Sequence, residues 1–191
     1  ILDKYIEQKN LKNIKIVYKP NPWKYFDKNS EETNFENYTF KNIIMDPFSK
    51  KNYDLRSKGS DKINLDLISY ENTNQMLRSI DALFTPLSTI MLEATMMGIP
   101  VCVYYPQDKG EFKKSFTYDL GREMFLEYFE KVKPIISQNE DDILSCFDNL
   151  LDKMNDKNYK KELKFNSLFF NESMNIDYKK ILNDNVEKSF S

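Results

Sequence analysis

Two hydroxyl side chains and one carboxylate lie close together in a stretch of the chain that is almost free of charge. Ser88 and Thr89 are adjacent, and Glu93 follows Thr89 by four residues. On a helix this spacing puts Thr89 and Glu93 on the same face, about 6 Å apart. Hydroxyls and amides at a helix start bind phosphate, whereas a carboxylate repels phosphate and accepts hydrogen bonds from a diol such as ribose. The three residues together predict a nucleotide site.

The charge distribution around Glu93 supports this interpretation. Glu93 is the only charged residue between Asp81 and Asp108, although 30% of the whole chain is charged. The alternative from the residues alone is a capped core helix whose single glutamate faces water.

The segment that carries these residues predicts a strand, a helix and a second strand. The apolar run 82–85 predicts a buried strand, and a helix then begins with a cap from the Ser88 or Thr89 hydroxyl. The helix is expected to end at Gly98, and residues 101–105 predict the second strand. Two strands joined in this way are typical of a parallel α/β sheet.

The sequence from Phe84 to Ala94, followed by Gly98-Ile99-Pro100-Val101, resembles the nucleotide-sugar site in the C-terminal half of GT-B glycosyltransferases. It is most similar to bacterial surface and capsular polysaccharide transferases, CDP-glycerol glycerophosphotransferases and UDP-N-acetylglucosamine 2-epimerases. The resemblance implies an α/β fold with a doubly wound, Rossmann-like parallel sheet. It also implies that Ser88 and Thr89 contact the donor phosphates and that Glu93 contacts the ribose.

A second motif follows the strand expected at 14–19. Lys19-Pro20-Asn21-Pro22-Trp23 is similar to the R-P-H-P-W turn of the surface-polysaccharide transferases, whose basic residue and histidine lie near the donor phosphate. Lysine keeps the positive charge but lacks the bidentate fork of arginine, and asparagine does not titrate. The resemblance therefore implies that Lys19 and Asn21 bind phosphate without transferring a proton. The alternative is a rigid surface turn with Trp23 packed on the core.

Four further residues are expected to border the site. Pro86 and Leu87 make the turn before the helix, and Tyr105 and Asp108 belong to a turn similar to the Y-x-P-x-D turn of glycerophosphotransferases. This turn leaves the carboxyl end of a strand, which is the ligand side of an open α/β sheet. The alternative for the lysine-rich loop that follows is a solvated surface.

Composition limits the class of protein. The chain has 191 residues, a net charge of -2 and no histidine. A general affinity for nucleic acid is not expected from this charge, and no metal is expected without histidine or a D-x-D pair. Two cysteines fit a reduced compartment, and no apolar run is long enough to span a membrane. We expect a location in the cytoplasm or peripherally at the inner membrane face.

The chain begins at Ile1, and we expect it to be part of a longer protein. Residues 1–191 are predicted to form one nucleotide-sugar-binding domain, with 170–191 as a terminal helical segment and an N-terminal acceptor domain outside the sequence. The resemblance implies a metal-independent, cofactor-free transfer of a sugar or sugar-like group from a UDP- or CMP/CDP-linked donor to a surface glycan. The alternatives are a UDP-sugar 2-epimerase-like isomerase and a non-catalytic adaptor that retains the fold.

Hydrophobic periodicity predicts the remaining elements. Asn139 is expected to cap a helix, with Glu140, Asp141 and Asp142 at its positive end. The aromatic cluster Phe165, Phe169 and Phe170 is interpreted as core. Further helices are expected at 2–8, 71–80, 119–132, 159–169 and 177–188, and strands at 42–45, 63–68 and 134–136.

Overall fold

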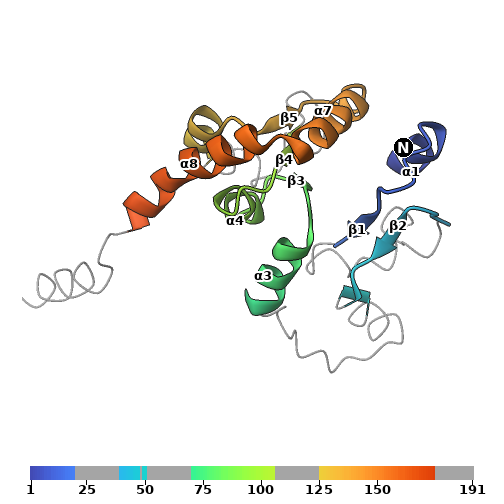
Figure 1. Ribbon diagram of the computed structural model, residues 1–191, viewed down its shortest axis with the longest axis horizontal. Coiled ribbons are helices and arrows are strands. Elements are labelled where there is room, and N and C mark those ends of the chain that lie inside the picture. The colour runs from blue at the N-terminus through green and yellow to red at the C-terminus, as the bar shows by residue number, and fades with distance from the viewer. Residues whose placement is uncertain (20–38, 48, 51–69, 106–124, 175–191) are drawn as a thin grey trace, which may run out of the picture. The chain divides into compact units, whose positions relative to one another are not determined.

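The computed structural model describes residues 1–19, 39–47, 49–50, 70–105 and 125–174 (Figure 1). They form a mixed α/β structure in which small parallel sheets are flanked by helices. The chain divides into two compact units, Ile1–Asn74 and Gln75–Ser191, and each unit has its own sheet. The expectation that residues 1–191 form one domain remains a prediction.

The first unit contains helix α1 (Leu2–Gln8) and the parallel strands β1 (Ile16–Tyr18) and β2 (Ile43–Met45). All three elements were expected from periodicity, although β1 is shorter than the predicted 14–19. Ile6 is the buried residue of α1 and is 2% exposed.

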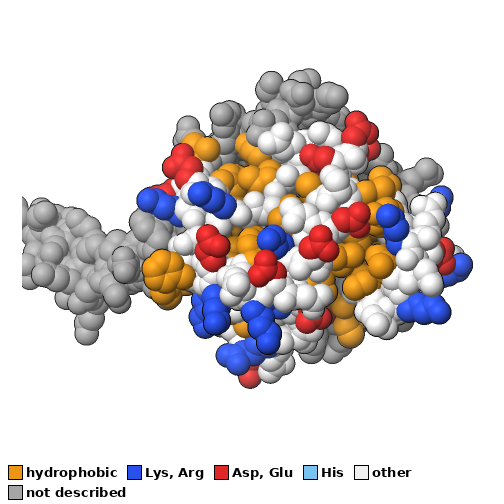
Figure 2. Space-filling model, turned by 45° about the horizontal axis from the view of Figure 1, so that its top comes forward, with side chains coloured by type: hydrophobic (Ala, Val, Ile, Leu, Met, Phe, Trp, Pro, Cys, Tyr) orange, Lys and Arg blue, Asp and Glu red, His pale blue; other side chains and the backbone are white. Residues whose placement is uncertain are grey.

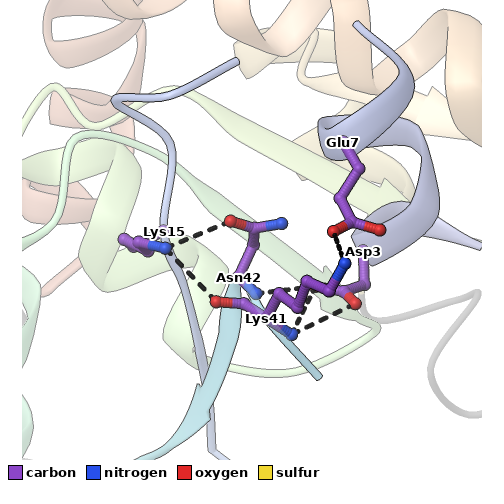
Figure 3. A network of polar contacts seen from close by, with 5 residues as sticks. All are labelled: Asp3, Glu7, Lys15, Lys41 and Asn42. Carbon is purple, nitrogen blue, oxygen red and sulfur yellow. Dashed lines mark hydrogen bonds and ion pairs between the residues drawn. The ribbon is translucent and has the colours of Figure 1, made fainter. Parts of the chain in front are cut away.

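A polar network connects α1 to the start of β2 (Figure 3). The Asp3 carboxylate accepts hydrogen bonds from the amides of Lys41, at 3.2 Å, and Asn42, at 2.7 Å. The Lys41 ammonium lies 2.6 Å from a Glu7 carboxylate oxygen. Lys15 donates to the Lys41 carbonyl at 3.3 Å and to the Asn42 side chain at 3.1 Å. These contacts connect distant segments of the chain, because Asp3 and Asn42 are separated by 39 residues.

Helix α3 (Tyr70–Ser79) begins in the first unit and ends in the second, close to the predicted range 71–80. The second unit then contains a parallel sheet with the order β3 (Leu83–Pro86), β4 (Val101–Tyr104) and β5 (Ile135–Ser137). The three described strands follow one another in chain order. The reversal of strand order that defines a doubly wound sheet is therefore not found among them.

Helix α4 (Ile90–Met96) connects β3 to β4, and residues 125–132 form a helix before β5. The predicted strand–helix–strand unit is confirmed, because β3 and β4 pair in parallel from Leu83–Val101 to Pro86–Tyr104. Gly98 has a φ of 76°, which is the left-handed conformation expected after a helix. The core of this unit is formed by the buried residues Leu77, Met91, Ala94, Val101, Val103, Tyr128, Val132 and Leu163.

Helices α7 (Ile143–Asn155) and α8 (Lys157–Met174) complete the described part of the second unit. Helix α7 packs on β4 and β5, and α8 packs on α4. Asp156 separates the two helices, and its carboxylate accepts hydrogen bonds from the Asn158 and Tyr159 amides at 3.0 and 2.9 Å. This contact stabilises the start of α8, since the first amides of a helix have no partner within it.

The prediction that Phe165 belongs to the core is wrong, because this side chain is 73% exposed. At about 100° per residue, Phe165 lies on the side of α8 opposite to the buried Leu163. The side chains of Phe169 and Phe170 lie outside the described residues. So do the strand expected at 63–68, the beginning of the helix at 119–132 and the segment 177–188.

Candidate functional site

The carboxyl ends of β3 and β4 lie side by side, because Pro86 is the register partner of Tyr104. The chain leaves β3 through Leu87 and Ser88 and enters α4 at this edge of the sheet. Ligands of open α/β sheets bind outside the carboxyl ends of the strands. The first turn of α4 therefore lies at the edge where open α/β sheets bind ligands, and the nucleotide site expected there remains a prediction.

The beginning of α4 differs from the prediction in its hydrogen bonds. Thr89 is the N-cap residue, but the described residues provide no side-chain cap for this helix. The Met91 and Leu92 amides donate to the Ser88 and Thr89 carbonyls at 3.1 and 3.0 Å. Thr89 has helical dihedral angles, φ -60° and ψ -23°, whereas a capping residue is usually extended. The prediction that a Ser88 or Thr89 hydroxyl caps α4 is thus wrong, and the tight first turn is the reason.

Glu93 lies one helical turn after Thr89, as its spacing predicted. Its amide donates to the Thr89 carbonyl at 3.4 Å, which confirms the helical relation of the two residues. The Glu93 side chain is half-buried, between the half-buried Leu92 and the buried Ala94. The carboxylate is therefore on the border between the core-facing and solvent-facing sides of α4.

The residues expected to border the site have different environments. Pro86 is exposed and Leu87 is half-buried against the core cluster. Tyr105 is only 5% exposed, its ring centroid lies 5.8 Å from that of Phe129, and its amide donates to the Ser137 carbonyl at 2.7 Å. The Tyr105 ring thus contributes to packing. Asp108 lies outside the described residues.

Lys19 directly follows β1 in the first unit, whereas Ser88, Thr89 and Glu93 belong to the second. The Lys19 ammonium is within 3.5 Å of the Thr73 hydroxyl oxygen, and the side chain is half-buried. Its approach to a phosphate at α4 remains a prediction. Asn21 lies outside the described residues.

Sequence reasoning missed the role of Asp142 at the turn between β5 and α7. Its carboxylate accepts hydrogen bonds from the Ser137 hydroxyl at 2.5 Å and the Gln138 amide at 2.9 Å. These bonds, the Ser137 bond first, lower the pKa of Asp142. The prediction that Asn139 caps the helix is wrong, because the N-cap residue of α7 is Asp142. The Asn139 side-chain oxygen instead accepts from the Asp141 and Asp142 amides in the turn before α7. The spacing of Asn139 and Asp142 around a turn was the available signal.

The electrostatics of the sheet edge are uneven. Burial raises the pKa of Tyr104, and the nearby charges of Glu140 and Asp142 raise it further. A negative field at the ends of β4 and β5 disfavours a phosphate there. An anion at this edge is therefore better accommodated on the β3 side, next to Ser88 and Thr89.

The two thiols do not form a nucleophilic site. Cys102 is completely buried, and burial, followed by the neighbouring Cys146 and Asp142, raises its pKa to about 12. Cys146 is half-buried, burial raises its pKa as well, and its sulfur lies 3.6 Å from the Ile136 carbonyl oxygen. Since the thiolate is the reactive form, both cysteines are structural.

The part of the chain that the structure describes contains no group of three or more cysteine, aspartate or glutamate side chains that would hold a metal ion. Among the same residues, no helix combines the length and apolar character needed to cross a bilayer. Comparisons with protein families, curated proteins and solved structures found no match to this chain.

Proposed function

We propose that this chain is the donor-binding part of a GT-B-type glycosyltransferase and that its sheet belongs to a Rossmann-like domain. One observation carries the proposal: a parallel β3–α4–β4 crossover begins its helix at the shared carboxyl edge, with Glu93 one turn along. This arrangement agrees with the resemblance of residues 84–101 to nucleotide-sugar sites. The proposed donor is a sugar or sugar-like group linked to UDP, CMP or CDP.

In the proposed complex, the donor phosphates lie next to the Ser88 and Thr89 hydroxyls. Neither hydroxyl is needed to cap α4, because the Met91 and Leu92 amides donate to backbone carbonyls. The Glu93 carboxylate accepts hydrogen bonds from the ribose hydroxyls one turn further along the helix. A contribution of Lys19 rests on the resemblance alone, because Lys19 belongs to the first unit.

Catalysis would depend on stabilising the nucleotide as it leaves the sugar. Negative charge develops on the phosphate oxygens in that step, and prearranged hydroxyl donors lower its free energy. The described residues of the site contain no evident general base for an acceptor hydroxyl, since Glu93 is assigned to the ribose. The resemblance implies that the base and the glycan acceptor site belong to the other half of a GT-B fold.

Calorimetric titration with UDP, CMP, CDP and GDP tests the site. We expect one of these nucleotides to bind, and Glu93→Ala and Thr89→Ala each to weaken binding by about 1–3 kcal/mol, because a polar ligand group then loses its partner. Glu71→Ala is the matched control, since Glu71 is an exposed acid in the first turn of α3. It should leave the affinity unchanged.

Two results would contradict the assignment. The absence of heat with all four nucleotides would favour a non-catalytic adaptor. Unchanged affinity in both Glu93→Ala and Thr89→Ala would remove the site from α4 even if a nucleotide binds.

A further inference from the structure

The solvent-facing side of α8 combines basic and apolar side chains on one narrow surface. At about 100° per residue, three exposed lysines and two exposed apolar residues fall within an arc of about 100°. Phe165 is 73% exposed and Leu168 is 44% exposed. We call this surface the outer face of α8, and it consists of Lys157, Lys161, Lys164, Phe165 and Leu168.

The packing of α8 on α4 fixes which side of the helix faces outward. Leu163 and Ser167 are buried, and the Ser167 hydroxyl donates to the Leu163 carbonyl at 2.7 Å. A Cβ atom placed on Gly98 would lie only 3.1 Å from the Lys160 carbonyl oxygen, so the two helices are in close contact. The helix cannot turn Phe165 inward without losing this packing. The outer face of α8 is thus presented by a fixed element.

The local charge of this face differs from that of the chain. The outer face of α8 carries three positive charges, although the whole chain has a net charge of -2. Among the side chains of α8 that the structure describes, residues 157–168, the one acid is the exposed Glu162, which lies about 60° beyond Phe165 and outside the arc. Figure 2 shows, on one side of the molecule, basic side chains in groups near exposed hydrophobic side chains.

From this combination we infer that the outer face of α8 docks on an anionic lipid surface. Lysine ammonium groups are attracted to acidic headgroups, while their aliphatic stems and the Phe165 ring enter the boundary between headgroups and acyl chains. A nucleic acid would satisfy the same lysines but would leave Leu168 in water. The positive charge of the lysines therefore favours an anionic partner, and the exposed apolar side chains favour a lipid over a nucleic acid. The inference does not depend on nucleotide binding.

Cosedimentation of the 191-residue chain with lipid vesicles tests the inference. We expect binding to vesicles of phosphatidylcholine with phosphatidylglycerol and little binding to phosphatidylcholine alone. Replacing Lys157, Lys161 and Lys164 by Gln should weaken binding about a hundredfold, at about fivefold for each lysine. Phe165→Ser with Leu168→Ser should weaken it about tenfold. Both sets of substitutions are at exposed positions and should not affect folding.

The control removes the same charge elsewhere. Lys4, Lys12 and Lys133 are exposed lysines outside α8, and their replacement by Gln should weaken vesicle binding much less. An equal loss in this control would show nonspecific attraction and overturn the inference. The absence of binding to the anionic vesicles would also overturn it.

Direct insertion is measured with a tryptophan at the apolar position. The double variant Phe165→Trp, Trp23→Phe moves the one tryptophan of the chain to α8. Anionic vesicles should shift the fluorescence emission of this tryptophan to shorter wavelength, and lipids with brominated acyl chains should quench it. Emission that responds to RNA and not to vesicles would overturn the inference in favour of a nucleic acid. A dimer that is disrupted by Phe165→Ser, with no response to vesicles, would overturn it in favour of a second copy of this chain.

Discussion

At the scale of single residues, Gly98 is the one glycine within the described ranges, and its backbone has a positive φ. Its φ of 76° is unfavourable for residues with a Cβ atom, and a Cβ there would meet the Lys160 carbonyl oxygen of α8 at 3.1 Å. The residue thus ends α4 and also permits the close approach of α8. Both features act on the segment that carries Glu93, because α4 connects the two strands of the site.

Gly98→Ala should lower the free energy of unfolding by about 1–2 kcal/mol, because alanine pays the cost of the left-handed conformation. Urea denaturation measures this change. Gly98→Asn introduces the same Cβ but tolerates the positive φ better, and it should be less destabilising. Equal losses in the two variants would show that the contact with α8, and not the backbone angle, dominates.

The thiols give a second prediction at this scale. Because burial raises the pKa of Cys102 to about 12, iodoacetamide should modify it only after unfolding, with Cys146 reacting first in the native chain. Mass spectrometry with and without urea measures the extent of modification. Rapid alkylation of Cys102 in the native protein, in a Cys146→Ser variant, would contradict the structural role.

At the scale of elements, the turn between β5 and α7 depends on a single carboxylate. Asp142 accepts from the Ser137 hydroxyl, which belongs to β5, and from the Gln138 and Asn139 amides that follow. It is also the N-cap residue of α7. This carboxylate therefore joins the end of the strand to the turn, whereas it makes no capping hydrogen bond to the amides of α7.

The lowered pKa of Asp142 makes this turn sensitive to acid. The folded-state pKa is below the unfolded value of about 3.9, so the ionised form stabilises the fold above that pH. The contribution should disappear as the pH falls through the folded-state pKa. The difference in unfolding free energy between the native chain and Asp142→Asn should thus be largest near neutral pH and shrink as the pH falls below the unfolded-state pKa.

Asp141→Asn is the matched control for this titration, because Asp141 is an exposed neighbour. Near neutral pH, the unfolding free energy of Asp141→Asn should differ less from that of the native chain. A difference for Asp142→Asn that does not change with pH would mean that the substitution acts through shape and not through charge.

At the scale of the whole molecule, the chain has two units with separate parallel sheets. A two-stranded sheet such as β1–β2 is marginally stable alone, and the contacts of Asp3 with Asn42 and of Glu7 with Lys41 connect it to α1. The second unit has a larger apolar core around β4. We therefore expect the two units to respond differently to a local loss of packing.

Ile6→Ala tests this difference, because Ile6 is buried in α1 of the first unit. The substitution should destabilise that unit by about 2–5 kcal/mol, as expected for a large-to-small change in a core. Hydrogen exchange should become faster at α1, β1 and β2 and remain unchanged at β3, β4 and β5. A uniform increase in both units would show that they unfold as one.

The sequence alone predicted most of the local structure of the described residues. The apolar run before Pro86, the glycine at 98 and the strand from Val101 specified the β3–α4–β4 crossover, and their positions agree with the structure to within a residue or two. These signals succeed because backbone preferences and burial periodicity are properties of neighbouring residues. The proposed nucleotide and the assignment of Lys19 remain predictions.

Contacts between distant segments determined two features that the local sequence patterns did not predict. Phe165 has the composition of a core residue, but the packing of Leu163 and Gly98 turns it outward. Similarly, Asp142 was interpreted from its position before a helix, whereas its partners come from the end of a strand. Periodicity gives the relative angles of side chains around a helix, and only the neighbouring elements determine which of those angles faces water.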